Sequence, residues 1–336
     1  MPDYLTFADV AAATHNEDLV PVVDEVAKRV TMWNDAPWKA SSDMLRDIGG
    51  REGDPPRGTW VAVDEGAKPN KGSQEKYAEE LGMIEAWSRS LKKTMDLSPH
   101  DKELRWREDR RHLRGLGLDL EEGLLYGNRN QDPRKFLGFM PRFSKITDID
   151  GVAGDEQLPF ITIDAKGNNA NGMSSLLLVY WDTDEGAHLI YPSHKKDNGM
   201  EFTAYPYVAE TQPDGTIIEV AKTKYACTAG LGIANRKSVI RIANIDTATE
   251  NKTAMLTNLE EAIYDAFAAM PVDFQSRAML YANNRVISFM RKGYAGRVSP
   301  ARYVDSVPKN AIGDVMFDSF VIRRCDSMLA TESKIV

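Results

Sequence analysis

The stretch from Ser98 to Phe143 reads SPHDKELRWREDRRHLRGLGLDLEEGLLYGNRNQDPRKFLGFMPRF, and it constrains the fold more than any other part of the chain. Ser98 suits the N-cap of a helix and Pro99 its first helical position. Leucines then recur at helical spacing, which predicts a helix over about 99–126. At 1.5 Å per residue this helix would be roughly 40 Å long, which is more than a compact two-layer domain needs.

The first half of the same helix is rich in cations. Between Lys102 and Arg114 six basic residues stand against three acidic ones. This pattern alone favours a solvated helix face with internal ion pairs, and the alternative is a surface that lies near a polyanion. The six basic residues are Lys102, Arg105, Arg107, Arg110, Arg111 and Arg114.

A long Gly/Pro-rich and charged stretch, from Ile48 to Lys76, lies on the N-terminal side. Within it, Trp60, Val61 and Val63 form only a short strand-like island flanked by turn residues. A loop this long is unusual in a compact domain, so it is functional, disordered, or an arm that reaches elsewhere. The following residues, 77–97, fit both a helix and an alternating strand.

On the C-terminal side, the pattern changes to strands. Strand-like runs separated by turn motifs extend from Leu158 to Asp246. After them we expect a helix from about Thr253 to Met270, a strand at Ala278–Tyr281, a short helix through Val286 and Met290, and an extended run at Phe317–Ile322. The fold class is therefore α+β.

The composition is that of an ordinary soluble protein: 336 residues, 42% hydrophobic and 27% charged. The net charge of −8 argues against a dedicated nucleic-acid binder. No apolar run approaches the ~18 residues of a membrane span, and the N-terminus lacks the pattern of a secretion signal. Cys227 and Cys325 cannot build a disulfide framework, so we expect two buried reduced thiols in a cytoplasmic protein.

No catalytic signature is found. A G-x-G motif at Gly230–Gly232 has asparagine at the third glycine position and no helix pattern after it, which favours a glycine pair in a turn. The acidic run at Asp148–Glu156 departs from the spacing of a calcium loop, and His188 and His194 lack the partners of a zinc set. We therefore expect no catalytic residues, no metal and no cofactor.

Taken in order, these elements resemble a tailed-phage major capsid protein of the Hong Kong 97-type fold, most closely those of short-tailed, epsilon15-like phages. Each motif alone is of modest specificity, but the ordered set spans nearly the whole chain. The passages that carry the resemblance are GTWVAVDEGAKPN, KYAEELGMIEAWSRSLKKTMDLSPHD, LEEGLLYGNRNQDPRKFLGFMPRF, and a β-rich body that closes with FDSFVIRRCDSML.

The resemblance implies a domain plan and resolves residues 77–97 as a strand followed by a short helix. The implied parts are an N-terminal arm (1–46), an extended β-loop (47–77), a peripheral domain (78–150) around the long spine helix, an axial domain (151–313) with a β-rich insertion, and a terminal strand (314–336) that returns to the peripheral domain.

The resemblance also implies a function. The chain would be a major capsid protein without enzymatic activity, assembled in the bacterial host cytoplasm into an icosahedral shell of hexamers and pentamers. Its partners would be copies of itself, portal, scaffolding and decoration or cement proteins, and packaged double-stranded DNA bound without sequence preference, but no membrane. Two alternatives stay open: a ring-forming tail or portal-associated protein, and a cytoplasmic enzyme that binds a nucleotide at residues 230–235.

The residues implied to carry this function form two groups. The basic residues of the spine helix, named above, would face the packaged DNA. In some members of the family the extended loop is joined to its neighbour by a Lys–Asn isopeptide bond, for which Lys68 or Lys71 would supply the amine, but we expect a non-covalent arm. The inter-subunit residues of this loop are Arg57, Trp60, Val61, Val63, Lys68 and Lys71.

Overall fold

A computed structural model shows that the chain divides into two compact units. It describes residues 30–52, 57–70, 72, 74–97, 101–147, 160–194, 199–295, 315–317 and 320–336. Unit 1 draws on Met1–Arg46, Glu80–Pro141 and His188–Leu231, and unit 2 on Asp47–Glu79, Arg142–Ala187 and Gly232–Val336.

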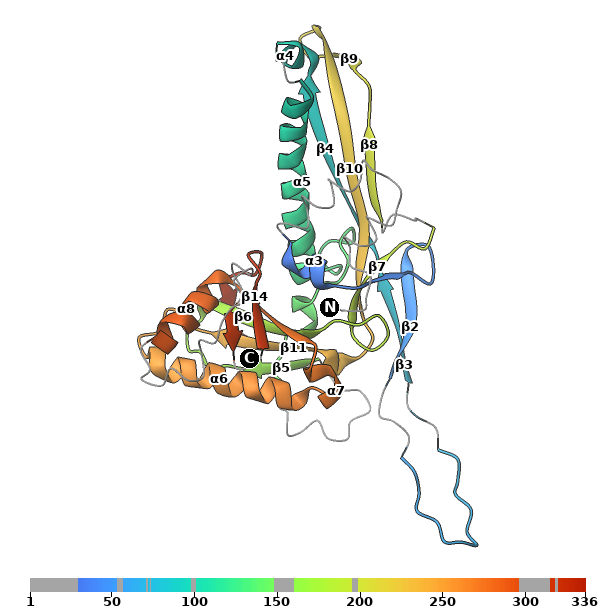
Figure 1. Ribbon diagram of the computed structural model, residues 1–336, viewed down its shortest axis with the longest axis vertical. Coiled ribbons are helices and arrows are strands. Elements are labelled where there is room, and N and C mark those ends of the chain that lie inside the picture. Colours follow the sequence, from blue (N-terminus) through green and yellow to red (C-terminus); the bar gives the residue numbers. More distant parts are fainter. Residues whose placement is uncertain are drawn as a thin grey trace. The chain divides into compact units, whose positions relative to one another are not determined.

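Unit 1 is a long helix that lies along a sheet with two long strands (Figure 1). Its elements are α3 (Thr31–Asp35), β1 (Trp38–Ala40), β4 (Gly82–Leu91), α4 (Lys92–Asp96), α5 (Asp101–Tyr126), β7 (Ala187–Tyr191), β8 (Met200–Ala204), β9 (Val208–Thr211) and β10 (Ile217–Ile233). β4 pairs antiparallel with β10 from Gly82↔Ala229 to Leu91↔Val220. β8 and β9 pair with β10 in turn, and β1 pairs in parallel with β7.

The sequence explains why α5 packs as it does. Leu113, Leu116, Leu120 and Leu124 are all buried, at 0–4% exposure, because their spacing places them on one face of the helix. The helix ends at Tyr126, where the chain turns back on itself. The Gly138 N–H donates to the Gly127 carbonyl at 2.8 Å, and the Phe139 N–H donates to the Leu124 carbonyl at 2.9 Å.

Glycine is required at this turn. A Cβ added to Gly127 would lie 2.3 Å from the Gly123 carbonyl oxygen and 2.6 Å from that of Phe136. No side chain fits this space without moving backbone, so the YGN passage marks the helix end for a steric reason.

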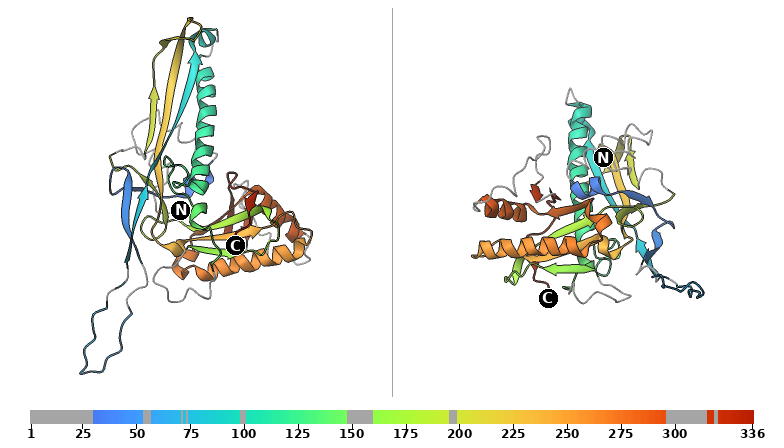
Figure 2. Two further views of the ribbon diagram at one scale, coloured as in Figure 1. Left: turned by 180° about the vertical axis from the view of Figure 1, so that it is seen from behind. Right: turned by 60° about the horizontal axis from the view of Figure 1, so that its bottom comes forward.

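Unit 2 contains a seven-stranded sheet with two longer helices on one face (Figures 1 and 2). Its elements are β5 (Ile161–Asp164), β6 (Asn171–Tyr180), η3 (Arg236–Ser238), β11 (Val239–Ile245), α6 (Lys252–Ala269), α7 (Val272–Gln275), β12 (Ala278–Ala282), α8 (Asn284–Ala295), β13 (Val315–Phe317), β14 (Phe320–Arg324) and β15 (Glu332–Ser333). The strand order is β13-β14-β12-β6-β11-β5, with β15 also paired to β6. Alternate residues of β6, such as Leu176 and Leu178, share one core with α6 and α8, so these helices cover that face of the sheet.

Unit 2 also includes most of a two-stranded ladder, β2 (Arg46–Glu52) with β3 (Gln74–Glu80), from which the extended loop projects. The strand and short helix expected in residues 77–97 are confirmed as β3, β4 and α4. The strand-like island at Trp60–Val63 is not a strand, since the described residues 57–70 contain none. The helix start at Ser98 and Pro99 lies outside the described residues.

The expected division into peripheral and axial domains stays a prediction. Residues 188–231 lie in unit 1, where β10 pairs with β4 from Val220 to Ala229. In the terminal segment, β14 pairs with β12 and β15 pairs with β6, all in unit 2. Strand patterns identify strands but carry no information about their partners.

Candidate interaction surfaces

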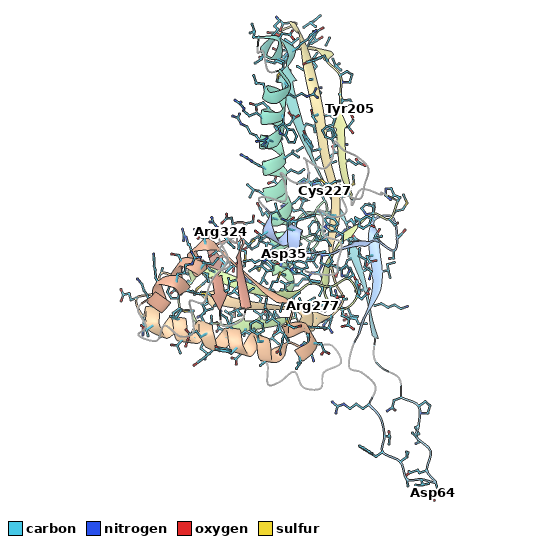
Figure 3. The ribbon with its side chains drawn as sticks, in the orientation of Figure 1. Asp35, Asp64, Tyr205, Cys227, Arg277 and Arg324 are labelled. Carbon is cyan, nitrogen blue, oxygen red and sulfur yellow. The ribbon has the colours of Figure 1, made fainter. Side chains whose placement is uncertain are left out.

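The extended loop presents its apolar side chains to solvent. Trp60 and Val63 are fully exposed and Val61 is 45% exposed. The Glu65 N–H donates to the Ala62 carbonyl at 3.1 Å, closing a turn next to Asp64, which Figure 3 places at the far end of the loop. Burying an indole contributes about 4 kcal/mol from its area alone, so this tip is well suited to a partner surface.

The charged residues of the loop are also exposed. Arg57 and Lys68 both lie in the described part of the loop, whereas Lys71 lies outside the described residues. The Asn70 side-chain amide donates to the Arg57 carbonyl at 2.8 Å, which holds the two arms of the loop together. We call residues 57–70 the loop tip.

The other end of the hairpin has the opposite character, with charged groups buried around Glu79 on β3. The Glu79 carboxylate accepts from Arg51 at 2.8 Å and from both terminal nitrogens of Arg142 at 2.6 and 2.7 Å. The side chains of all three are at most 10% exposed. Arg51 also donates its Nε to the Ile233 carbonyl at 2.9 Å. Such bidentate, charge-assisted bonds fix geometry strongly.

An aromatic ring completes this cluster. The guanidinium carbons of Arg51, Arg142 and Arg236 lie 5.6, 5.9 and 5.6 Å from the centre of the Phe160 ring. Arg236 in turn holds Glu75 of β3 at 2.7 and 2.8 Å. We call the buried residues Arg51, Tyr77, Glu79 and Arg142, together with Phe160, the loop root.

Burial decides the electrostatics of the loop root. Desolvation lowers the pKa of Arg51, and Glu79 works against that shift by favouring the charged form. Burial also raises the pKa of Tyr77, with a further contribution from Asp47, while Arg51, whose guanidinium lies 4.8 Å from the ring centre, lowers it. Gly49 packs directly on this ring, since a Cβ there would lie 2.5 Å from Tyr77 atoms.

Sequence reasoning missed the loop root. Arg51, Glu79 and Arg142 are far apart in the chain, and β2, β3 and the turn after α5 bring them together. The only sequence signal was the MPRF passage that contains Arg142, which is part of the resemblance without a role for this arginine.

The cations expected on the spine helix differ in exposure and in partners. Arg107, Arg111 and Arg114 are exposed and lie on one face of α5, with Arg111 paired to Glu108 at 3.0 Å. Arg105 instead donates to the Thr223 hydroxyl of β10 at 2.9 Å and lies 4.0 Å from Asp109.

The remaining two cations of the set are Arg110 and Lys102. Arg110 is half-buried, with its guanidinium carbon 5.6 Å from the centre of the Trp106 ring. Lys102 lies in α5, but its side chain is not among those that the structure describes. We call Arg107, Arg111 and Arg114 the α5 stripe.

The sheet of unit 1 has an exposed face with aromatic residues. Alternate residues of β4 are exposed along the strand, among them Met83 (59%), Trp87 (46%) and Leu91 (44%). Tyr205 stacks on Trp87 with ring centres 5.7 Å apart, and Figure 3 labels Tyr205 beside the sheet. Exposed aromatic and long apolar side chains gathered on one face are typical of a protein interaction surface.

Ion pairs cross the same face. Lys224 contacts Glu85 at 2.6 Å, and Arg89 contacts Glu210 at 3.0 Å. Glu210 also pairs with Lys222, and these contacts lower the pKa of Glu210. We call this surface, with Met83, Trp87, Leu91 and Tyr205, the outer sheet face.

The candidate nucleotide loop is not a loop. Gly230–Gly232 lies inside β10, and a Cβ at Gly230 would lie 3.0 Å from the Glu80 carbonyl oxygen. The glycine permits close backbone approach within a strand, so the motif does not form a phosphate-binding turn. In the described part of the chain, no three or more His, Cys, Asp or Glu residues are grouped to hold a metal ion, and no helix there is long and apolar enough to cross a membrane.

Comparison with known proteins supports one family. The family model described as major capsid protein GP7 matches residues 14–336. A search of curated proteins finds no match.

Two solved structures share the fold over almost the whole chain. A chain from a structure of bacteriophage epsilon15 is 17% identical, with a TM-score of 0.62 over 90% of this chain and 88% of that one. A chain of the bacteriophage JBD30 capsid is 12% identical, with a TM-score of 0.50 over 93% and 94%. The fold is that of phage capsid proteins of the Hong Kong 97 type.

Proposed function

The chain belongs to the major capsid protein GP7 family, and from this premise we propose how its described surfaces build a shell. It is a capsid-forming protein, whose copies assemble into the icosahedral shell of a phage. The ring-forming and nucleotide-using alternatives are therefore set aside. A shell repeats each contact many times, so every contact can be modest on its own.

We propose that the loop tip of one subunit lies on the outer sheet face of a neighbouring subunit. The observation that carries this proposal is the complete exposure of Trp60, which no contact within its own described subunit covers. The outer sheet face offers Trp87, Met83 and Leu91 as apolar partners. Arg57 and Lys68 would form additional pairs at the rim with Glu85 and Glu210, which already contact Lys224 and Arg89 of their own subunit.

The loop root would serve this contact by holding the hairpin at a fixed angle. A buried carboxylate held by two arginines allows little freedom to β2 and β3, so the tip reaches its partner without a large ordering cost. We propose that the contact is non-covalent and that the protein acts without catalysing a reaction.

We also propose that the α5 stripe faces packaged double-stranded DNA. Contacts from Arg107, Arg111 and Arg114 would be to phosphates, and they would be salt-sensitive and indifferent to sequence. Reversing Arg107 and Arg111 to glutamate should leave shells intact but lower the DNA that they retain. Failure of the shells themselves would assign these residues to an interface instead.

Assembly in the host cytoplasm with portal, scaffolding and decoration proteins completes the proposed cycle. Co-purification of such proteins with early particles would test this part. A particle that forms at full yield from the pure chain would remove the need for a scaffold.

The loop contact is tested by the double variant Trp60→Ala/Val63→Ala. Under assembly conditions, negative-stain microscopy and sedimentation should show free subunits or small oligomers in place of closed shells. Val272→Ala is the matched control, because Val272 is 79% exposed but lies on α7, away from the loop. Closed shells at wild-type yield from the double variant would disprove the contact.

A further inference from the structure

A pocket of about 890 Å³ opens in unit 2 between the start of α6 and the length of α8. Its lining includes Leu256 and Phe289, both buried. Three exposed cations, Lys252, Arg285 and Lys292, also line it. Hydroxyl and amide groups supply the remaining polar lining, from Thr247, Thr253, Asn284 and Ser288.

α8 presents several of these polar groups along one face. On α8, Arg285, Ser288 and Lys292 stand three and four residues apart, so they share a face of the helix. Lys252 is the first residue of α6 and also lines the pocket. The positive end of the α6 dipole adds to the potential at this point.

The charge of the pocket is unusual for this protein. Among the described residues that line it, three are cationic and none is acidic, although the whole chain carries a net charge of −8. Within the described part of the chain, Lys252, Arg285 and Lys292 form no ion pair with a carboxylate. A pocket lined by cations of one sign raises the local concentration of anions, so the arrangement favours an external anion.

We propose that this pocket, the α6–α8 pocket, binds phosphate groups. Three cations match the multiple charge of a phosphate chain better than the single charge of a carboxylate, and the Thr253 and Ser288 hydroxyls can donate to its oxygens. Phe289 is only 8% exposed and offers no ring face on which a base could stack. Recognition is therefore of phosphate and not of base, whether the phosphate belongs to free polyphosphate or to a nucleic-acid backbone. The inference does not depend on the loop contact.

Calorimetry on the full-length subunit tests the pocket, with inorganic tripolyphosphate and a short single-stranded DNA as separate probes. Lys292→Ala should weaken tripolyphosphate binding roughly tenfold, the usual loss for one charge-assisted bond. Arg291→Ala is the matched control, because Arg291 is the adjacent exposed cation on α8 but does not line the pocket. Arg285→Ala/Lys292→Ala should abolish binding while leaving thermal unfolding and shell assembly unchanged.

The two probes separate the possible sources of phosphate. Binding of both, lost together in the double variant, supports a nucleic-acid backbone, whereas binding of tripolyphosphate alone supports a small phosphate compound. No binding of either probe, equal losses in Lys292→Ala and Arg291→Ala, or tighter binding of poly-glutamate would each overturn the proposal. Because assembly is measured on the same variants, loss of phosphate binding is distinguishable from failure to form shells.

Discussion

The loop root and the loop tip belong to one hairpin, yet they invert the usual distribution of side chains. The root buries charges, with Glu79 held between Arg51 and Arg142, whereas the tip exposes Trp60 and Val63 completely. The charges of the root have all their bonding partners within one subunit. The exposed indole of the tip packs on no apolar surface in the described part of its own subunit, and it becomes buried only against a second subunit.

This difference separates folding from assembly along a single element. Substitutions at the root should act on the free subunit, because its contacts form within the chain. Substitutions at the tip should leave the free subunit unchanged and act on the shell.

Glu79→Ala should lower the free energy of unfolding of the free subunit by about 3–5 kcal/mol, since it leaves two arginines buried without their carboxylate. Chemical denaturation of the unassembled chain measures this change. Glu75→Ala is the control on the same strand, because Glu75 is 44% exposed and its pair with Arg236 should contribute at most ~1 kcal/mol. Equal effects of the two substitutions would show that the root is not the buried cluster described above.

The sequence predicted α5 and its end correctly because leucine spacing and a glycine turn are local signals. It did not predict the loop root, since Glu79 and Arg142 meet only through the tertiary fold. Arg105 and Arg107 look alike in the sequence, but only Arg105 shares a helix face with the buried Leu113. Counting four-residue steps from Leu113 back through Asp109 would have separated them.

The sequence pattern also did not predict the partners of the terminal strands. β14 and β15 read as ordinary extended runs, and their alternation is compatible with several sheets. β14 pairs with β12, and β15 pairs with the first residues of β6, before the stretch that pairs with β11 and β12. These pairings depend on the complete fold. The strand before α5 was likewise ambiguous in its own residues, and only the order of elements along the chain resolved it.

Alkaline pH should weaken the root before it affects the tip. Burial raises the pKa of Tyr77 above its usual value near 10, so the neutral hydroxyl is favoured in the folded state. The resulting stability is complete below about pH 10 and is lost as the pH rises through the folded pKa. The wild type should therefore lose more stability above about pH 10 than Tyr77→Phe, in denaturation curves measured at several pH values. Equal loss of stability at alkaline pH in both proteins would show that Tyr77 does not cause the pH dependence.

The smallest effect is expected for the exposed charges of the tip. Arg57→Ala/Lys68→Ala should leave unfolding of the free subunit unchanged, because both residues are exposed and lie outside the root. In assembly, each rim pair should contribute at most ~1 kcal/mol, so shells should still close, but more slowly at low salt. The difference from the wild type should shrink as salt is added, since screening weakens pairs between exposed groups. Light scattering during assembly, at low and high salt, measures both effects.

Lys76→Ala is the matched control, because Lys76 is also exposed but lies on β3 at the base of the hairpin. If Lys76→Ala slows assembly as much as the double variant, the charges that speed assembly are spread over the whole hairpin and are not specific to the loop tip.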